Sequence, residues 1–169
     1  VGISKSPVSG AMELPVTRHL ADGGFDSTFS GDGTVYINMG NVQSLMGIYP
    51  RIAFDNDGKI IIASSRMGAG SMDIFVCRID TTGSLDPTFN GTGTMVFDVN
   101  GNNTEYDLAA NLDVDANNNI WIAATTRNGV SSADNDFVVA KIKPDGTLDA
   151  TFNGNGRKTF TPNSNENYC

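Results

Sequence analysis

The chain contains few of the residues on which disulfide-bonded, histidine-dependent or membrane-spanning proteins rely. Its 169 residues include two cysteines, one histidine, one tryptophan, three glutamates and five lysines. Cys169 is the last residue and Cys77 lies in a strand-like run, so no disulfide framework is indicated and the redox state of both is left open. We expect Cys77 to be a small buried side chain. No apolar run approaches the ~18 residues that a membrane span requires.

Charge and periodicity exclude two further classes of protein. The formal net charge of -8 gives a surface that repels phosphate backbones, so a nucleic-acid partner is not expected. Apolar residues do not recur at a helical period anywhere in the chain, which argues against an α-helical fold. The polar residues are mainly Asp, Asn, Ser, Thr and Gly, which favour turns over helix interiors. This composition is common in secreted bacterial β-proteins.

One sequence motif, called the repeated phrase below, occurs three times, at residues 25–33, 85–93 and 148–156, with spacings of 60 and 63 residues. Its shared letters are an Asp, a Thr, a Phe and two glycines. A fixed period of this size indicates one supersecondary unit stacked on copies of itself. We divide the chain accordingly into a partial repeat (1–33), two repeats (34–93 and 94–160) and a polar tail (161–169).

Each repeat contains four short segments that are rich in β-branched and aromatic residues and are separated by turn residues. Four strands in about 60 residues is the size of one propeller blade. The sequence therefore predicts an all-β fold of β-propeller-type repeats, each of four antiparallel strands. Aligning the repeats gives eleven strands, or about three blades with the first strand missing. In the blade that begins at residue 51 the predicted strands are 51–55, 59–63, 73–79 and 94–97. The run at 60–63 is apolar on consecutive residues, which predicts a strand covered on both faces. The predicted hairpin turns 56–58 and 116–118 end in Gly58 and Asn118, residues that tolerate positive φ.

Three blades are too few to close a ring, because known propellers have about four to eight. We therefore expect either a homo-oligomer, in which rings close between chains, or a part of a longer chain. The chain begins with Val1 and inside a blade, which favours a fragment or a processed form. An open, solenoid-like stack of the same repeats is the alternative architecture.

The repeats resemble the delta-60 repeat family. The family phrase is matched at residues 83–89 (Gly-Ser-Leu-Asp-Pro-Thr-Phe) and 146–152 (Gly-Thr-Leu-Asp-Ala-Thr-Phe), and nearly at 23–29. A second family motif is matched at residues 57–60 (Asp-Gly-Lys-Ile). The resemblance covers nearly the whole chain and implies a propeller-like fold in a bacterial extracellular or cell-surface protein. It implies no shared activity and no catalytic residue.

The repeated residues are interpreted as structural, because Asp and Thr can fix a turn, Phe can anchor between sheets and glycine permits unusual backbone angles. A calcium site is the competing interpretation for Asp113, Asp115 and Asn117, whose spacing is similar to the start of a calcium loop. The glycine and glutamate that such a loop needs at its sixth and twelfth positions are absent, so a hairpin turn is favoured and no cofactor is expected. His19, the only candidate base for nucleophilic catalysis, occupies a strand position.

Specificity on a repeated scaffold usually resides in the loops that differ between copies. These are residues 39–50, 100–110 and 127–136, and they carry the candidate ligand-binding residues Tyr49, Tyr106 and Arg127. Trp121 is the fourth candidate, since aromatic rings stack on sugars, although its strand position favours core packing.

We therefore expect a non-catalytic extracellular or cell-surface module for binding, adhesion or assembly, with a protein or glycan as partner. A carbohydrate-binding lectin of the same fold is the alternative, and a fragment of a secreted enzyme is the third possibility. Paired carboxylates for glycoside cleavage are disfavoured, because Asp55 and Asp115 recur at matching repeat positions.

Overall fold

The fold is all-β in a computed structural model that describes residues 4–5, 12–40, 49–68, 70–101, 105–127 and 135–161. Eleven strands and no helix lie within these ranges. No helix among the described residues is therefore long and apolar enough to cross a bilayer. The strands are β1 (Ser4–Lys5), β2 (Met12–Thr17), β3 (Thr34–Asn38), β4 (Arg51–Phe54), β5 (Ile60–Met67), β6 (Met72–Ile79), β7 (Thr94–Phe97), β8 (Leu108–Val114), β9 (Ile120–Arg127), β10 (Asn135–Ile142) and β11 (Arg157–Phe160).

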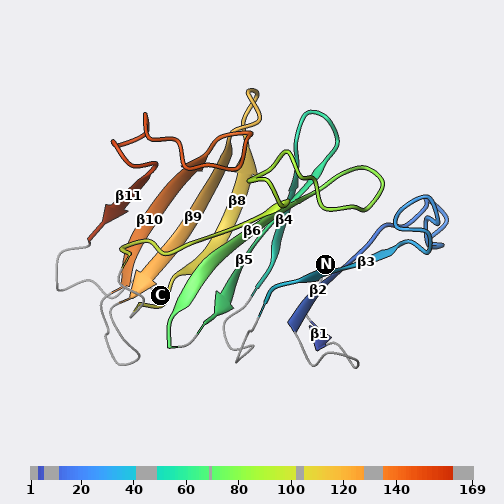
Figure 1. Ribbon diagram of the computed structural model, residues 1–169, viewed down its shortest axis with the longest axis horizontal. Helices are drawn as coiled ribbons and strands as arrows, with labels where there is room; N and C mark the ends of the chain where they lie inside the picture. The colour runs from blue at the N-terminus through green and yellow to red at the C-terminus, as the bar shows by residue number, and fades with distance from the viewer. Residues whose placement is uncertain are drawn as a thin grey trace.

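The strands form three antiparallel sheets that stand side by side in chain order (Figure 1). The first sheet has the order β1-β2-β3, the second β4-β5-β6-β7 and the third β8-β9-β10-β11. The predicted fold class is thus confirmed, with two sheets of four strands and one that has three strands within the described residues. We refer to the three sheets as the first, second and third blade.

The inner strands of the second blade, β5 and β6, are buried on both faces because this blade stands between the other two. β5 and β6 are apolar on consecutive residues, with Ile62 opposite Cys77 and Ala63 opposite Val76. These four side chains are fully buried. The sequence expectation of a doubly covered strand at residues 60–63 and of a buried Cys77 is confirmed. The Cys77 thiol is free, and burial raises its pKa to about 12, so it is a packing residue and not a nucleophile.

Two apolar clusters join the blades. Leu14, Val16 and Phe29 of the first blade pack with Ile60 and Phe75 of the second. The alternate side chains of the second blade face the other way and pack against the third blade. This second cluster includes Ile61, Ile74, Phe89, Phe97, Leu112, Ile122 and Val138. The period-2 alternation of each strand therefore supplies one face to each neighbouring blade.

Hairpin turns connect the first two strands of each complete blade. Gly58 has φ +77° and Asn118 has φ +61°, so both turns use the left-handed backbone that the sequence predicted for these positions. The two turns are also in contact. The Asn56 backbone N–H donates to Asn118 Oδ1 at 2.9 Å, and its side-chain amide donates to the Ala116 carbonyl at 3.1 Å. The first strands of the two complete blades, β4 and β8, thus lie beside each other.

Candidate functional site

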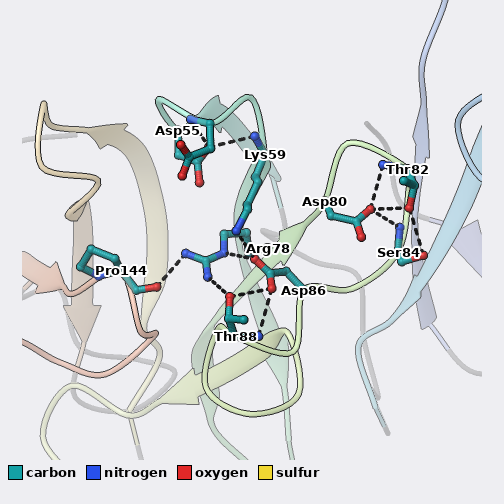
Figure 2. Close-up of polar contacts among 10 residues, drawn as sticks. Asp55, Lys59, Arg78, Asp80, Thr82, Ser84, Asp86, Thr88 and Pro144 are labelled. Atoms are coloured by element: carbon teal, nitrogen blue, oxygen red, sulfur yellow. Dashed lines mark hydrogen bonds and ion pairs between the residues drawn. The ribbon is translucent and has the colours of Figure 1, made fainter.

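The repeated phrase forms a polar joint between neighbouring blades, and its fullest form is centred on Asp86 (Figure 2). Arg78 Nε and Lys59 Nζ both lie against Asp86 Oδ2, at 2.9 and 2.8 Å. Asp86 Oδ1 accepts hydrogen bonds from the backbone N–H and hydroxyl of Thr88, at 3.0 and 2.7 Å. Arg78 also reaches the next blade, because its Nη1 donates to the Pro144 carbonyl at 2.7 Å.

The electrostatics of this joint suit a fixed anion. Burial alone would raise the pKa of Asp86, but hydrogen bonds from Lys59 and Thr88 and the Arg78 charge more than offset it. The pKa of Asp86 therefore lies well below its usual range. A carboxyl group that stays ionised in this way accepts hydrogen bonds but does not supply a proton. Asp86 can therefore hold the joint together, and it is a poor general acid.

The first and second joints are each completed by a turn of the following blade. The Ser30 backbone N–H donates to the Thr82 carbonyl at 2.7 Å, and the Asn90 N–H donates to the Asp145 carbonyl at the same distance. Glycine follows each carbonyl because the chain is too close for a side chain. A Cβ at Gly83 would lie 2.8 Å from Ser30 N, and one at Gly146 would lie 2.5 Å from Asn90 N.

The first and third copies of the joint differ from the second in the basic side chains that contact the aspartate. In the first copy, Arg18 contacts Asp26 at 2.8 Å and donates to the Thr81 carbonyl at 2.6 Å. In the third, Lys141 replaces the arginine and contacts Asp149 at 2.9 Å. Hydrogen bonds from Thr151 and Lys141 lower the pKa of Asp149 to about 2. All three aspartates therefore serve as acceptors, as the sequence interpretation of a structural phrase predicts.

Two of the four candidate ligand-binding residues are brought together. The Arg127 guanidinium lies over the Tyr106 ring, 5.3 Å from its centroid, and the Tyr106 backbone N–H donates to the Arg127 carbonyl at 3.0 Å. Tyr49 is exposed. Trp121 is half-buried on the outer face of the third blade, where its ring meets Phe152 edge-on at 5.2 Å. The four residues therefore do not form one site.

The candidate metal ligands are engaged in the β8–β9 turn. Asp115 Oδ1 accepts the backbone N–H groups of Asn117 and Asn119, and its Oδ2 accepts Trp121 Nε1 at 3.1 Å. These contacts, led by the Asn119 side chain, lower the pKa of Asp115 to about 2. Asp113 Oδ1 accepts the N–H of Val114. Within the described ranges, no group of three or more His, Cys, Asp or Glu residues could hold a metal ion. The geometry is that of a side-chain-capped turn.

His19 lies at the edge of the first blade. It is exposed, it pairs with Phe25 in an antiparallel bridge, and its Nδ1 is 3.0 Å from the Gly23 carbonyl. The ring of Phe25 lies 4.9 Å from the imidazole. His19 therefore contributes to the turn that follows β2.

Sequence reasoning missed a buried acidic pair beside Tyr106. Glu105 and Asp107 are both buried, and Glu105 Oε2 accepts hydrogen bonds from Asn100 Nδ2 and from the Thr126 hydroxyl. Asp107 Oδ2 accepts the Val99 N–H at 2.7 Å, while its Oδ1 is buried without a hydrogen bond. The available signal was the alternation of acids around Tyr106, which departs from the turn-like composition of the other loops.

This environment shifts the ionisation of Asp107. Burial raises the pKa of Asp107 to about 6, and the charges of Asp98 and Glu105 add to the rise. The Val99 N–H and the nearby Thr126 hydroxyl oppose it. The pKa of Asp107 therefore rises, in contrast to the lowered pKa values of Asp86 and Asp149 in the joints.

Comparison with known families agrees with this architecture. Residues 56–89 and 116–152 match the model of a family described as a domain of unknown function (DUF5122) beta-propeller. The repeats are of the β-propeller type. Each matched segment of these propeller repeats begins in the turn after β4 or β8 and ends at the Phe of the repeated phrase. The match supports a delta-60-like repeat, while the delta-60 name itself stays a prediction. No curated protein and no solved structure matches the chain.

The acidic pair allows a prediction about the stability of the propeller repeats. The folded-state pKa of Asp107, about 6, is above its ordinary value of 3.8, so folding favours the protonated carboxyl. The contribution of this group to the free energy of unfolding is full below pH 3.8 and falls as the pH rises to about 6. We expect Asp107→Asn, which keeps an acceptor for Val99, to stabilise the protein by about 2–3 kcal/mol at neutral pH.

Urea unfolding of wild type and Asp107→Asn at neutral and at acidic pH measures this effect. The advantage of the variant should disappear in acid, because the wild-type carboxyl is then protonated as well. Asp57→Asn, at an exposed aspartate, is the control and should change stability little at either pH. A stability difference for Asp107→Asn that is independent of pH would contradict the prediction.

Proposed function

We propose that this protein is a non-catalytic binding module of β-propeller repeats, located outside the cell or on its surface. Its partner is a protein or a glycan, and its blades also serve assembly. The composition, poor in Lys and Glu and rich in turn residues, supports the location, as does the resemblance to the delta-60 repeats. The low pKa values of Asp86 and Asp149 support the non-catalytic part, since these carboxylates are held as hydrogen-bond acceptors.

One observation carries the binding role: two segments that do not repeat meet beside β6. Glu105 and Asp107 exchange backbone hydrogen bonds with Met72 of β6, at 3.0 and 2.8 Å. Tyr106, between them, stacks with Arg127 at the end of β9. We call the residues 105–107 and Arg127 the loop edge. It combines a half-buried tyrosine ring and a half-buried guanidinium group with two buried carboxyl groups behind them, on a scaffold of strands.

The chemistry of the loop edge suits a polar ligand with an apolar face. A tyrosine ring supplies a stacking surface, and an arginine supplies a planar set of hydrogen-bond donors. Sugars present both an apolar face and hydroxyl groups, so a glycan fits this combination. Rigid placement of such residues by neighbouring strands favours affinity, because little side-chain entropy is lost on binding.

An immobilised glycan array tests this proposal with wild type, Tyr106→Ala and Arg127→Ala. We expect binding that free glycan competes away, with a loss of about tenfold or more in each variant. Tyr36→Ala, at an exposed tyrosine of β3, is the matched control and should bind like wild type. Binding that survives both loop-edge variants would contradict the assigned surface, and conversion of the bound glycan would contradict the non-catalytic role. If no glycan on the array is bound, a glycan partner is excluded and a protein partner is the one that remains.

A further inference from the structure

The joints described above have two halves, and each half recurs at an end of the blade stack. One half is the Phe of the repeated phrase with the backbone N–H that follows it. The other half is a turn whose carbonyl accepts that N–H and whose glycine packs on the Phe ring. Between the second and third blades, for example, Asn90 N donates to Asp145 O, and a Cβ at Gly146 would lie 3.0 Å from Phe89 Cδ2.

The third blade carries the first half without a mate among the described residues. Asn153 has φ +52°, close to the +54° of Ser30 and the +51° of Asn90, so its N–H is presented in the same way. No hydrogen bond from this N–H is formed with the described residues. Phe152 is only partly buried, whereas Phe29 and Phe89 are fully buried. We call the surface made of Phe152, Asn153 and the outer face of β8–β11 the tail. This surface is not the polar tail at residues 161–169.

The outer face of the third blade is apolar in the same pattern as the buried face of the second. Phe137 and Phe160 are opposite each other in β10 and β11, as Ile74 and Phe97 are in β6 and β7. Phe137 and Phe160 are 44% and 46% exposed, while Ile74 and Phe97 are 0% and 7% exposed. The face has the residues of a blade contact, and no neighbouring blade lies on it within the described part of the chain.

The first blade carries the second half, also without a mate among the described residues. The turn at residues 20–24 has the same backbone bonds as the turns at 80–84 and 143–147, with the N–H of the glycine donating back three residues. Gly23 has φ +88°, and a Cβ there would meet nothing within 4 Å. The flanking Leu20 and Phe25 are 50% and 59% exposed. We call residues 20–25 the head.

We propose that the tail of one chain binds the head of a second copy of this chain. This inference deepens the assembly part of the proposed function and rests on it. Asn153 then donates to the Asp22 carbonyl of the partner subunit, and Gly23 of the partner subunit packs on Phe152. Phe25 of the partner subunit occupies the place in which Leu85 and Leu148 pack at the internal joints. The contact uses different surfaces on the two copies, so it can be repeated to form a ring or a row.

Two differences make this contact weaker than the internal joints. Lys141 occupies the place of Arg18 and Arg78 and contacts Asp149. An arginine can contact the aspartate with one nitrogen and donate to the following turn with another, whereas lysine has only one nitrogen. The face of the first blade that would meet the tail is more polar, with Pro15, Thr17 and His19 in the places of Phe75, Cys77 and Ile79. We therefore expect association in the micromolar range that depends on protein concentration.

Sedimentation equilibrium of the 169-residue chain under reducing conditions tests the proposal. Wild type should associate beyond the 17.9 kDa monomer as its concentration rises. Gly23→Ala places a methyl group where the internal joints leave no room, and should weaken association about tenfold or more. Gly154→Ala is the matched control: its φ is also positive at +79°, but its Cβ meets nothing, as at Gly91 of the internal joint. It should associate like wild type.

A mixing experiment tests the polarity of the contact. Phe160→Asp changes an exposed tail residue, and Gly23→Ala changes the head, so each variant alone should be monomeric at concentrations at which wild type associates. An equimolar mixture should form a heterodimer, because one chain retains an intact tail and the other an intact head. A symmetric contact between two tails would not be restored by mixing. Circular dichroism confirms that both variants are folded.

Lys141→Arg provides a gain-of-function test that does not depend on damage to the fold. The guanidinium group should complete the joint as Arg78 does, and should tighten association about tenfold. Monomers at all concentrations for both wild type and Lys141→Arg would overturn the proposal, as would association that Gly23→Ala leaves unchanged. Tyr106→Ala should associate like wild type, so a failed glycan test and a failed assembly test are distinguishable.

Discussion

Replacing Asp86 by asparagine is expected to lower the free energy of unfolding by about 3–5 kcal/mol. The side chains of Asp86 and Arg78 are only 7% and 5% exposed, and Lys59 contacts the same carboxylate oxygen. Asparagine keeps the size of the side chain but removes its charge, which leaves a buried guanidinium and an ammonium group without an anion. An unpaired buried charge is costly because neither water nor a counter-ion replaces the lost partner.

The matched control for Asp86→Asn is Asp26→Asn in the first blade. The same phrase and the same arginine contact are present there, but Arg18 is 32% exposed and solvent can replace the lost partner. The control should therefore lose much less stability than Asp86→Asn, because an exposed ion pair contributes little. Equilibrium urea unfolding of the two variants measures the difference. Equal losses would show that burial does not decide the strength of the joint.

The Asp86 joint also predicts how stability depends on acid. The folded-state pKa of Asp86 is below its ordinary value of 3.8, so its contribution is present above that pH and is lost as the pH falls toward the folded pKa. Asp86→Asn should therefore remove part of the acid sensitivity of the protein. The contribution of Asp107 to the free energy of unfolding has the opposite pH dependence, since it decreases as the pH rises from 3.8 to about 6.

Replacing Gly146 by alanine is expected to lower the free energy of unfolding by about 3–4 kcal/mol. Backbone strain and overpacking both contribute to this loss. The φ of +82° disfavours any residue with a Cβ by about 1–2 kcal/mol. The added methyl group would also lie 2.5 Å from Asn90 N and 3.0 Å from Phe89 Cδ2, and such overpacking costs about 1–3 kcal/mol. The backbone of Asn90 cannot move away without breaking its hydrogen bond to Asp145.

Gly23→Ala separates the two costs, because Gly23 has φ +88° at the equivalent turn but no atom within 4 Å of its Cβ position. It should lose only the backbone cost, about 1–2 kcal/mol. Thermal or urea unfolding of both variants is the measurement, at concentrations low enough that the chain is monomeric. A loss at Gly146 no larger than at Gly23 would contradict the close contact between the second and third blades.

Much of the fold could be predicted from short-range patterns. The repeated phrase gave the period, the alternating β-branched residues gave the strands, and Gly58 and Asn118 marked the turns that the structure contains. The doubly apolar run at residues 60–63 indicated burial on both faces, which is confirmed. These features are local, because pleat and turn geometry depend on neighbouring residues.

The loop edge could not be predicted in the same way. Tyr106 and Arg127 were singled out separately, on loops that differ between copies, and nothing in their spacing says that they stack. Their contact depends on how residues 105–107 run beside Met72 and on where β9 ends. The pKa of Asp107 likewise depends on its burial and on groups distant in sequence, such as Thr126, whose hydroxyl opposes the rise.

The sequence by itself determined the repeat, the strand order within each blade and the structural character of Asp86 and its copies. Each follows from residue types at fixed spacing. Only the tertiary structure decided which copies of the joint are complete. Asp26, Asp86 and Asp149 belong to nearly identical phrases, yet among the described residues a following blade completes the joint only at Asp26 and Asp86, because the third blade stands at an end of the stack. For the same reason Phe152 and Gly23, at opposite ends of the stack, meet no neighbouring blade within the described part of the chain.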